Sequence, residues 1–147
     1  MPWQSEADCK DFLRAAVDTG REASIRCVSS KGAEVDFEDG DYSPLRSALE
    51  TETHTSICAT ESSGESAART IRIIDMLFET GATLDFRYGL GDTVLHTAAA
   101  ISSPVVVQHL LDLGSDVMLY DWEYLRGRPI DYARCEEVRK LLERAMR

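Results

Sequence analysis

The feature that most constrains the fold of this chain is a six-residue phrase that occurs three times. It reads GAEVDF at 32–37, GATLDF at 81–86 and GSDVML at 114–119. Each copy follows a stretch in which apolar residues recur with helical spacing. A phrase that returns along a chain indicates a repeat architecture, in which one small structural unit stacks on the next.

A second phrase lies between the copies of the first. It reads SPLRSA at 43–48, TVLHTA at 93–98 and RPIDYA at 128–133. A hydroxyl residue opens two copies and proline occupies the first helical position in two, as is typical of helix starts. Downstream of the second copy, an apolar pair at 106–107 is followed by another at 110–111, which indicates one face of a helix.

Together these residues resemble the ankyrin repeat family. The stretch 91–117 follows the family pattern without a gap, with Val94 in place of proline and Ser102 in place of the glycine between helices. The resemblance implies an all-α, ankyrin-repeat solenoid of stacked helix-turn-helix units joined by β-hairpin-like loops. We expect a single domain over 1–147, with units at about 8–37, 38–86, 87–121 and 122–147. The first and last units are atypical, and the last has lost about four residues between its helices.

One segment breaks the period. Counting against the third unit leaves 17 additional residues, about 51–67, between the two helices of the second unit. They are rich in Ser, Thr and Glu, so we expect them to project from the edge of the stack, as a loop or as extensions of both helices. Thr60, Ser62 and Ser63 lie near glutamates, which leaves open a phosphorylation site for an acid-directed kinase.

Charge and composition narrow the classes of partner. The 147 residues include 26 acidic and 16 basic side chains, a formal net charge of −10, and 44% are hydrophobic. Such an excess of acid repels phosphate backbones, so we expect no nucleic-acid binding. No apolar run approaches the ~20 residues of a bilayer-spanning helix, and the first residues lack the layout of a secretory signal. We therefore expect no membrane association and a cytoplasmic location, with the nucleus as the alternative.

The sequence offers little for a cofactor or a metal ion. No strand and glycine-rich turn lead into a helix that begins with Lys-Ser or Lys-Thr, as a phosphate-binding loop requires. His54 and Cys58 are four residues apart, but two ligands do not make a zinc site. We therefore expect no cofactor and no metal.

The two remaining histidines have structural interpretations. His96 stands where the family's helix-start phrase has its histidine, and there the resemblance implies hydrogen bonds between neighbouring units. His109 lies on the second helix of the third unit, where we expect it at the surface or between helices.

Aromatic residues gather where the loops turn. Tyr120, Trp122 and Tyr124 alternate through the third loop, which is two residues longer than the family pattern, and Tyr42 and Tyr88 lie in the two preceding loops. Alternate residues of an extended segment face the same way. Tyr and Trp are the residue types that dominate binding energy at interfaces. Packing against the short fourth unit is the competing interpretation of these side chains.

The resemblance to the family implies that loop tips and the exposed faces of the first helices form a concave surface that binds another protein. We therefore predict a protein–protein interaction module. Residues 1–66 carry 14 acidic and six basic side chains, which suits a protein partner with a basic patch. The predicted binding residues are Glu38, Asp39, Tyr42, Glu50, Arg87, Tyr88, Leu90, Asp92, Ile101, Tyr120, Trp122 and Tyr124.

A small-molecule-binding protein or an enzyme is the alternative function. The insertion could fold over the concave side and close a pocket against the aromatic loop tips. Acid–base catalysis of an isomerisation or cyclisation would then draw on His54, Glu50, Arg46, Tyr42 and Tyr88. We favour the binding module because of the aromatic residues at the loop tips and the excess of acid in the first units.

Overall fold

The computed structural model describes residues 6–37, 42–50, 64–89, 91–122 and 127–147. Within these ranges lie seven α-helices and one short 3-10 helix. In chain order they are α1 (Glu6–Asp18), α2 (Glu22–Ser30), α3 (Pro44–Glu50), α4 (Gly64–Glu79), α5 (Val94–Ile101), α6 (Pro104–Asp112), η1 (Pro129–Tyr132) and α7 (Glu136–Ala145).

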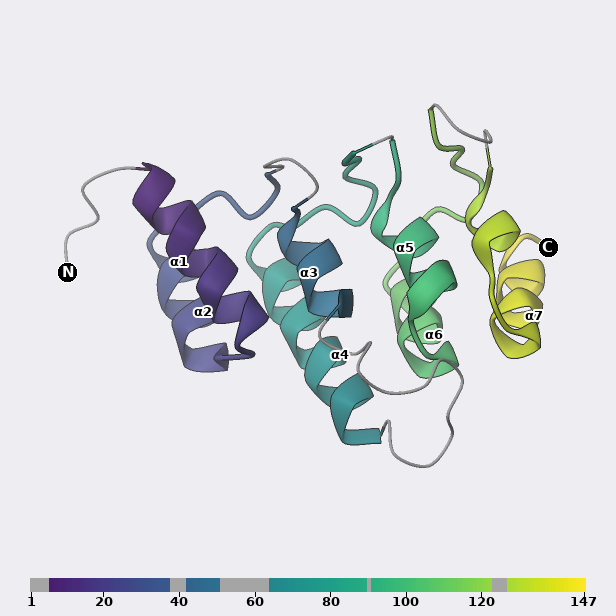
Figure 1. Ribbon diagram of the computed structural model, residues 1–147, viewed down its shortest axis with the longest axis horizontal. Helices are drawn as coiled ribbons and strands as arrows, with labels where there is room; N and C mark the ends of the chain where they lie inside the picture. The colour runs from purple at the N-terminus through teal and green to yellow at the C-terminus, as the bar shows by residue number, and fades with distance from the viewer. Residues whose placement is uncertain (1–5, 38–41, 51–63, 90, 123–126) are drawn as a thin grey trace.

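The helices form two layers that run the length of the molecule (Figure 1). The inner layer holds α1, α3, α5 and η1, and the outer layer holds α2, α4, α6 and α7. Each helix packs against its partner within a unit and against the equivalent helices of adjacent units. The loops between units project beyond the same edge of both layers. The prediction of an all-α solenoid is confirmed.

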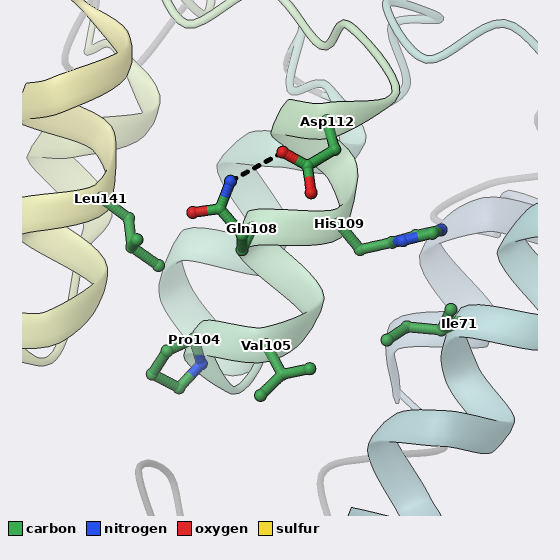
Figure 2. A pocket seen from close by; sticks show the side chains of 7 residues that line it. All are labelled: Ile71, Pro104, Val105, Gln108, His109, Asp112 and Leu141. Atoms are coloured by element: carbon green, nitrogen blue, oxygen red, sulfur yellow. Dashed lines mark hydrogen bonds between the residues drawn. The ribbon is translucent and has the colours of Figure 1, made fainter.

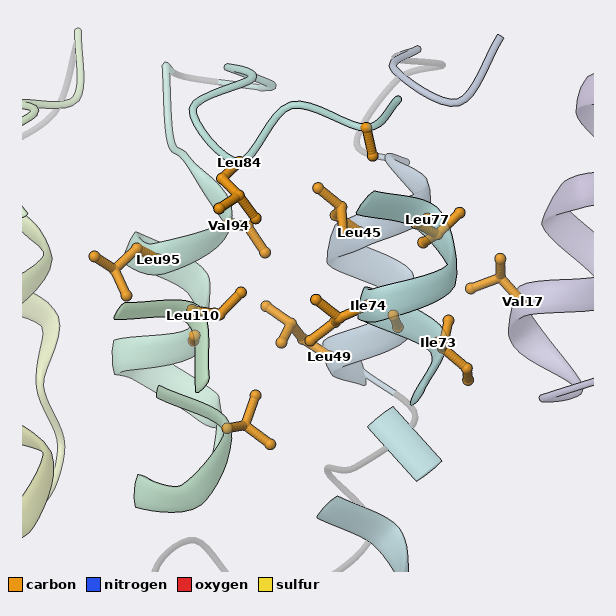
Figure 3. Close-up of a cluster of buried hydrophobic side chains, with 14 of the residues drawn as sticks. Val17, Leu45, Leu49, Ile73, Ile74, Leu77, Leu84, Val94, Leu95 and Leu110 are labelled. Carbon is orange, nitrogen blue, oxygen red and sulfur yellow. The ribbon is translucent and has the colours of Figure 1, made fainter. Parts of the chain in front are cut away.

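The apolar stripes meet between the layers (Figure 3). Leu45 and Leu49 of α3 are buried, as are Ile73, Ile74 and Leu77 of α4. A unit of two short helices cannot cover such stripes alone, so each one depends on its neighbours for a closed core.

The three hexapeptides form equivalent corners. Gly32, Gly81 and Gly114 begin them with φ of +79°, +108° and +101° respectively. A residue with a side chain is strained in this left-handed region, which explains why glycine follows the outer helix in each of the first three units.

The hexapeptides are also joined to one another by hydrogen bonds. Both carboxylate oxygens of Asp36 accept the backbone N–H of Thr83 at 2.9 Å. Asp85 Oδ1 accepts the backbone N–H of Asp116 in the same way, at 3.2 Å. In each case the fifth residue of one hexapeptide holds the third residue of the next. The last hexapeptide has Met118 at its fifth position, so this carboxylate ladder ends there.

His96 links the third and fourth units, as expected. The backbone N–H of Thr93 donates to Nδ1 at 3.1 Å, so Nδ1 is an acceptor and the ring proton is on Nε2. Nε2 therefore donates to the carbonyl oxygen of Gly127 at 3.1 Å. Tyr132 meets the same ring edge-on, with the centroids 5.7 Å apart.

The fourth unit is abbreviated. Its inner element is the single 3-10 turn η1, with Pro129 at its first position and the Asp131 carboxylate accepting the Arg128 N–H at 2.8 Å. The outer helix α7 is strongly amphipathic, with Val138 and Leu142 buried and a charged opposite face. No helix in the described ranges is long and apolar enough to span a bilayer.

Most of the predicted insertion, residues 51–63, lies outside the described residues, together with His54, Cys58 and the proposed phosphorylation sites. The helix α4 begins at Gly64, so residues 64–67 of the predicted insertion belong to the outer helix of the second unit.

Candidate functional site

The third hairpin, between α6 and η1, exposes large apolar side chains. Met118, Tyr120 and Trp122 are 44%, 47% and 63% exposed, whereas Asp121 between them is buried. This alternation fits the extended segment that the sequence predicts. Trp122 is the most exposed of the large apolar side chains in the described part of the chain.

Arg87 of the second hairpin holds the third hairpin in place. Its Nη1 donates to the carbonyl oxygen of Gly91 at 2.9 Å and to that of Tyr120 at 2.6 Å. The guanidinium also lies over the Trp122 ring, 5.3 Å from the centroid. Two hydrogen bonds and a cation–π contact therefore fix the position of an exposed tryptophan.

Gly91 lies directly under Trp122. A Cβ atom at position 91 would come within 2.6 Å of Trp122 Cγ and 2.8 Å of its backbone nitrogen, and the φ of Gly91 is +90°. Both the conformation and the close approach of the indole require glycine here.

The base of the third hairpin is fastened to the fourth unit. The Asp121 N–H donates to the Gly127 carbonyl at 3.0 Å, and the Tyr132 hydroxyl donates to the Asp121 carboxylate. Burial, the bond to Asp121 and neighbouring carboxylates raise the pKa of the Tyr132 phenol. Above this base, the Arg128 guanidinium stacks on Tyr120, 4.6 Å from the ring centroid.

Tyr88 of the second hairpin points inward. We expected it at an exposed tip, but it is only 3% exposed. Its hydroxyl donates to the Thr93 carbonyl at 3.2 Å and is also hydrogen-bonded to the Thr97 hydroxyl. Burial raises the pKa of this phenol. Arg46 lies 5.7 Å from the centroid of the Tyr88 ring and its Nε pairs with Glu50 at 3.0 Å.

Tyr42, in the first hairpin, is half-buried in a separate cluster. Arg14 of α1 lies over its ring, 4.1 Å from the centroid, and Phe37 packs beside it at 5.8 Å. Burial, followed by the charge of Asp18, raises the pKa of the Tyr42 phenol. Asp18 in turn accepts a hydrogen bond from Ser47.

The two tyrosine clusters repeat each other. Arg14 and Asp18 occupy the same positions in α1 as Arg46 and Glu50 do in α3, and each pair surrounds a tyrosine of the following hairpin. The proposed catalytic set is therefore divided between two inter-unit junctions, and its histidine, His54, lies outside the described residues. A pattern that recurs with the repeat has a structural explanation, so these tyrosines serve as spacers between units.

The remaining predicted binding residues differ in exposure. Glu50 is exposed, and Arg87, Asp92 and Ile101 are half-buried. Burial, and then the neighbouring Asp121, raises the pKa of Asp92. The predicted residues that lie outside the described ranges are Glu38, Asp39, Leu90 and Tyr124. Arg128 and Gly91 were not among the predicted binding residues, although each lies in or beside a turn between units.

A groove lies in the outer layer, where the sequence predicted no site. It is a groove of about 450 Å³ lined by residues of α4, α6 and α7: Ile71, Pro104, Val105, Gln108, His109, Asp112 and Leu141 (Figure 2). His109 reaches from α6 toward α4, where its Nε2 lies 2.6 Å from the Asp75 carboxylate, which confirms its role between helices. Val105 of α6 is exposed to solvent, and an exposed valine on this helix is the sequence feature that could have indicated the groove.

Known proteins share this architecture. No protein-family model matches the chain. The putative ankyrin repeat protein FPV230 of Fowlpox virus (strain NVSL) is 31% identical over 75 residues, which are 51% of this chain. The chain spans only 39% of the length of that relative.

Among solved structures, the chain is similar to the ankyrin repeat domain of Bcl-3, described as a unique member of the IkappaB protein family. The TM-score is 0.71 at 22% identity, and the match covers 89% of this chain and 50% of the other. This likeness shows the fold. With the recurring hexapeptides, the equivalent corners and the curated relative, it leads to one conclusion: the chain has the ankyrin repeat fold, and its sequence is similar to that of an ankyrin repeat protein.

Proposed function

We propose that this chain is a protein–protein interaction module that binds its partner on the hairpin tips and the inner helices, with the third hairpin as the main contact. The observation that carries the proposal is the position of Trp122. Its ring is largely exposed to solvent, yet Arg87 and the backbone at Gly91 hold it in one place.

A fixed, exposed tryptophan has a clear energetic use in binding. Exposed aromatic surface gains free energy when a partner covers it, and a side chain that is already ordered loses less entropy on binding. Trp, Tyr and Arg are also the residue types most often found to dominate binding energy. All three types meet at the third hairpin.

The relatives and the charge distribution support the same function. Ankyrin repeats are named in both similar proteins, and the excess of acid in residues 1–66 suits a partner that presents a basic patch toward the first units. The enzyme alternative has less support, because its candidate residues divide between two repeated clusters.

Affinity capture tests the proposal. The immobilised full chain is incubated with a native cell lysate, and bound proteins are quantified by mass spectrometry for the native chain and for Tyr120→Ala/Trp122→Ala. We expect the double variant to lose about 2 kcal/mol or more of binding free energy, roughly thirtyfold in affinity.

Phe78→Ala is the matched control. Phe78 is also an exposed aromatic, 40% accessible, but it lies on the outer helix α4. Its variant should capture the same proteins as the native chain. Equal capture by the native chain and the double variant would reject the third hairpin as the binding surface.

A further inference from the structure

We propose that the third hairpin recognises a carboxylate: the side chain of an Asp or Glu that lies beside a bulky apolar residue in a peptide segment of the partner. Arg87 would form the principal contact and Arg128 a second one. The inference rests on the proposed function and specifies the partner's chemistry.

The hydrogen bonds of Arg87 leave one edge of its guanidinium available. Nη1 has two hydrogens, and the two carbonyl oxygens of Gly91 and Tyr120 use both. One face of the planar group lies over Trp122. The Nε and Nη2 hydrogens point in the plane of the group, away from the covered face, and form the parallel pair of donors that matches a carboxylate.

Neither the Arg87 nor the Arg128 guanidinium forms an ion pair with a carboxylate among the described residues. Other arginines do: Arg46 pairs with Glu50 at 3.0 Å and Arg72 with Glu22 at 3.1 Å. The Arg87 and Arg128 guanidinium groups instead contact aromatic rings, and Arg87 also donates to two carbonyl oxygens. Neither positive charge is neutralised by a paired carboxylate, so an anion supplied from outside can bind there.

Arg128 extends the site along the hairpin. Its guanidinium stacks on Tyr120, and its Nε is buried without a hydrogen-bond partner in the described part of the molecule. Buried donors of this kind are rare in folded proteins. The two guanidinium groups thus flank an exposed strip formed by Met118, Tyr120 and Trp122.

The composition of the site selects a peptide carboxylate over other anions. A nucleic acid would bring a row of phosphates to a chain with net charge −10, and the repulsion would oppose binding. A single carboxylate needs one arginine fork, and the exposed apolar strip then requires an apolar neighbour in the same segment.

The first experiment selects ligands without knowledge of the partner. A display library of random short peptides is panned on the immobilised full chain, on Arg87→Gln and on Arg139→Gln. Arg139 is an exposed arginine of α7, so its variant has the same change in net charge at a distant position. We expect Asp or Glu next to aromatic or large aliphatic residues to be enriched on the native chain and on Arg139→Gln, and not on Arg87→Gln.

The second experiment leaves the protein unchanged. The strongest selected peptide is compared with its Glu→Gln or Asp→Asn form by calorimetry, and we expect a loss of roughly 10- to 100-fold in affinity, as for a hydrogen bond to a charged group. Arg128→Gln should lower the affinity for the acidic peptide by less than Arg87→Gln does. Arg87→Lys should retain only part of the affinity that Arg87→Gln loses. In NMR spectra, the Nε–Hε signal of Arg87 should shift when the acidic peptide binds.

Several outcomes would overturn the proposal that the site binds a carboxylate. These are selected peptides enriched in Lys or Arg, equal affinity for the acidic and amide peptides, or a single-stranded oligonucleotide or phosphopeptide that binds more tightly than the carboxylate peptide. If capture of partners still depends on Trp122 in that case, the interaction module stands and only its specificity is rejected.

Discussion

The second and third hairpins hold aromatic side chains in opposite ways. Tyr88 in the second is buried, and its hydroxyl forms hydrogen bonds with two threonines, Thr93 and Thr97. Trp122 in the third is 63% exposed and lies on a glycine. An aromatic residue is thus buried at one junction between units and exposed at the next.

The difference shows what decides whether an aromatic residue is buried in a stack of repeats. The layer in front of Tyr88 supplies polar partners for its hydroxyl and an arginine for its ring. The backbone under Trp122 has no side chain at position 91, so the indole covers it with one face while the remainder of the ring stays in solvent. The surroundings of an aromatic residue, more than its type, therefore decide whether it is buried or exposed.

Truncating each aromatic residue gives the largest contrast. Tyr88→Ala should lower the free energy of unfolding by about 3–5 kcal/mol, as for other large core side chains. Trp122→Ala should lower it by less than about 1 kcal/mol while removing most partner binding. Urea unfolding, followed by circular dichroism, measures the first quantity. Similar losses of stability in both variants would contradict the division of roles.

Alanine at two glycines sharpens the role of the backbone under the indole. Gly91→Ala should cost about 2–3 kcal/mol, because a left-handed conformation and a clash with Trp122 act together. Gly32→Ala should cost only about 1 kcal/mol, since its φ is also positive but no atom lies within 4 Å of the added Cβ. The quenching of tryptophan fluorescence should change in the first variant alone. Equal costs would show that the contact with Trp122 is loose.

Alkaline pH tests the buried tyrosine of the second hairpin by a smaller effect. Burial raises the pKa of the Tyr88 phenol, so the folded chain keeps a proton that the unfolded chain loses near pH 10. Stability from this group is complete below about pH 10 and falls as the pH rises further, by up to about 1.4 kcal/mol per pH unit. Urea unfolding at several alkaline pH values measures the slope.

Tyr88→Phe should reduce that slope, because it removes the phenol that the folded chain keeps protonated. A slope that is the same in the native chain and in Tyr88→Phe would mean that other groups control alkaline unfolding.

The repeat was readable from the sequence because its geometry is local. The hexapeptide needs glycine at its first position for a left-handed corner, and the helix starts need a hydroxyl or a proline. These requirements fall within a few residues of one another, so the phrases at 32, 81 and 114 located the corners. His96 was interpretable for the same reason, since its bond to the Thr93 N–H spans one helical turn.

The orientation of the hairpin side chains could not be read in this way. Tyr88 and Trp122 both stand near glycines in loops, and their different fates depend on partners 9 and 35 residues away, namely Thr97 and Arg87. Arg128 was not predicted as a site residue because its contact with Tyr120 joins two sides of one hairpin. Contacts of this kind depend on the assembled stack, and the period of a repeat fixes positions but not the direction of each side chain.

The end of the carboxylate ladder at Met118 has a mechanical meaning. Beyond that point the hydrogen bonds that join the last unit to the third run from His96 to the Gly127 carbonyl and from the Arg134 N–H to the Ala99 carbonyl, at 3.4 Å. The Gly127 carbonyl also accepts the Asp121 N–H, and the Tyr132 hydroxyl donates to the Asp121 carboxylate, so the last unit also holds the base of the third hairpin. Detaching the terminal unit would therefore release Tyr120 and Trp122 from their fixed positions as well.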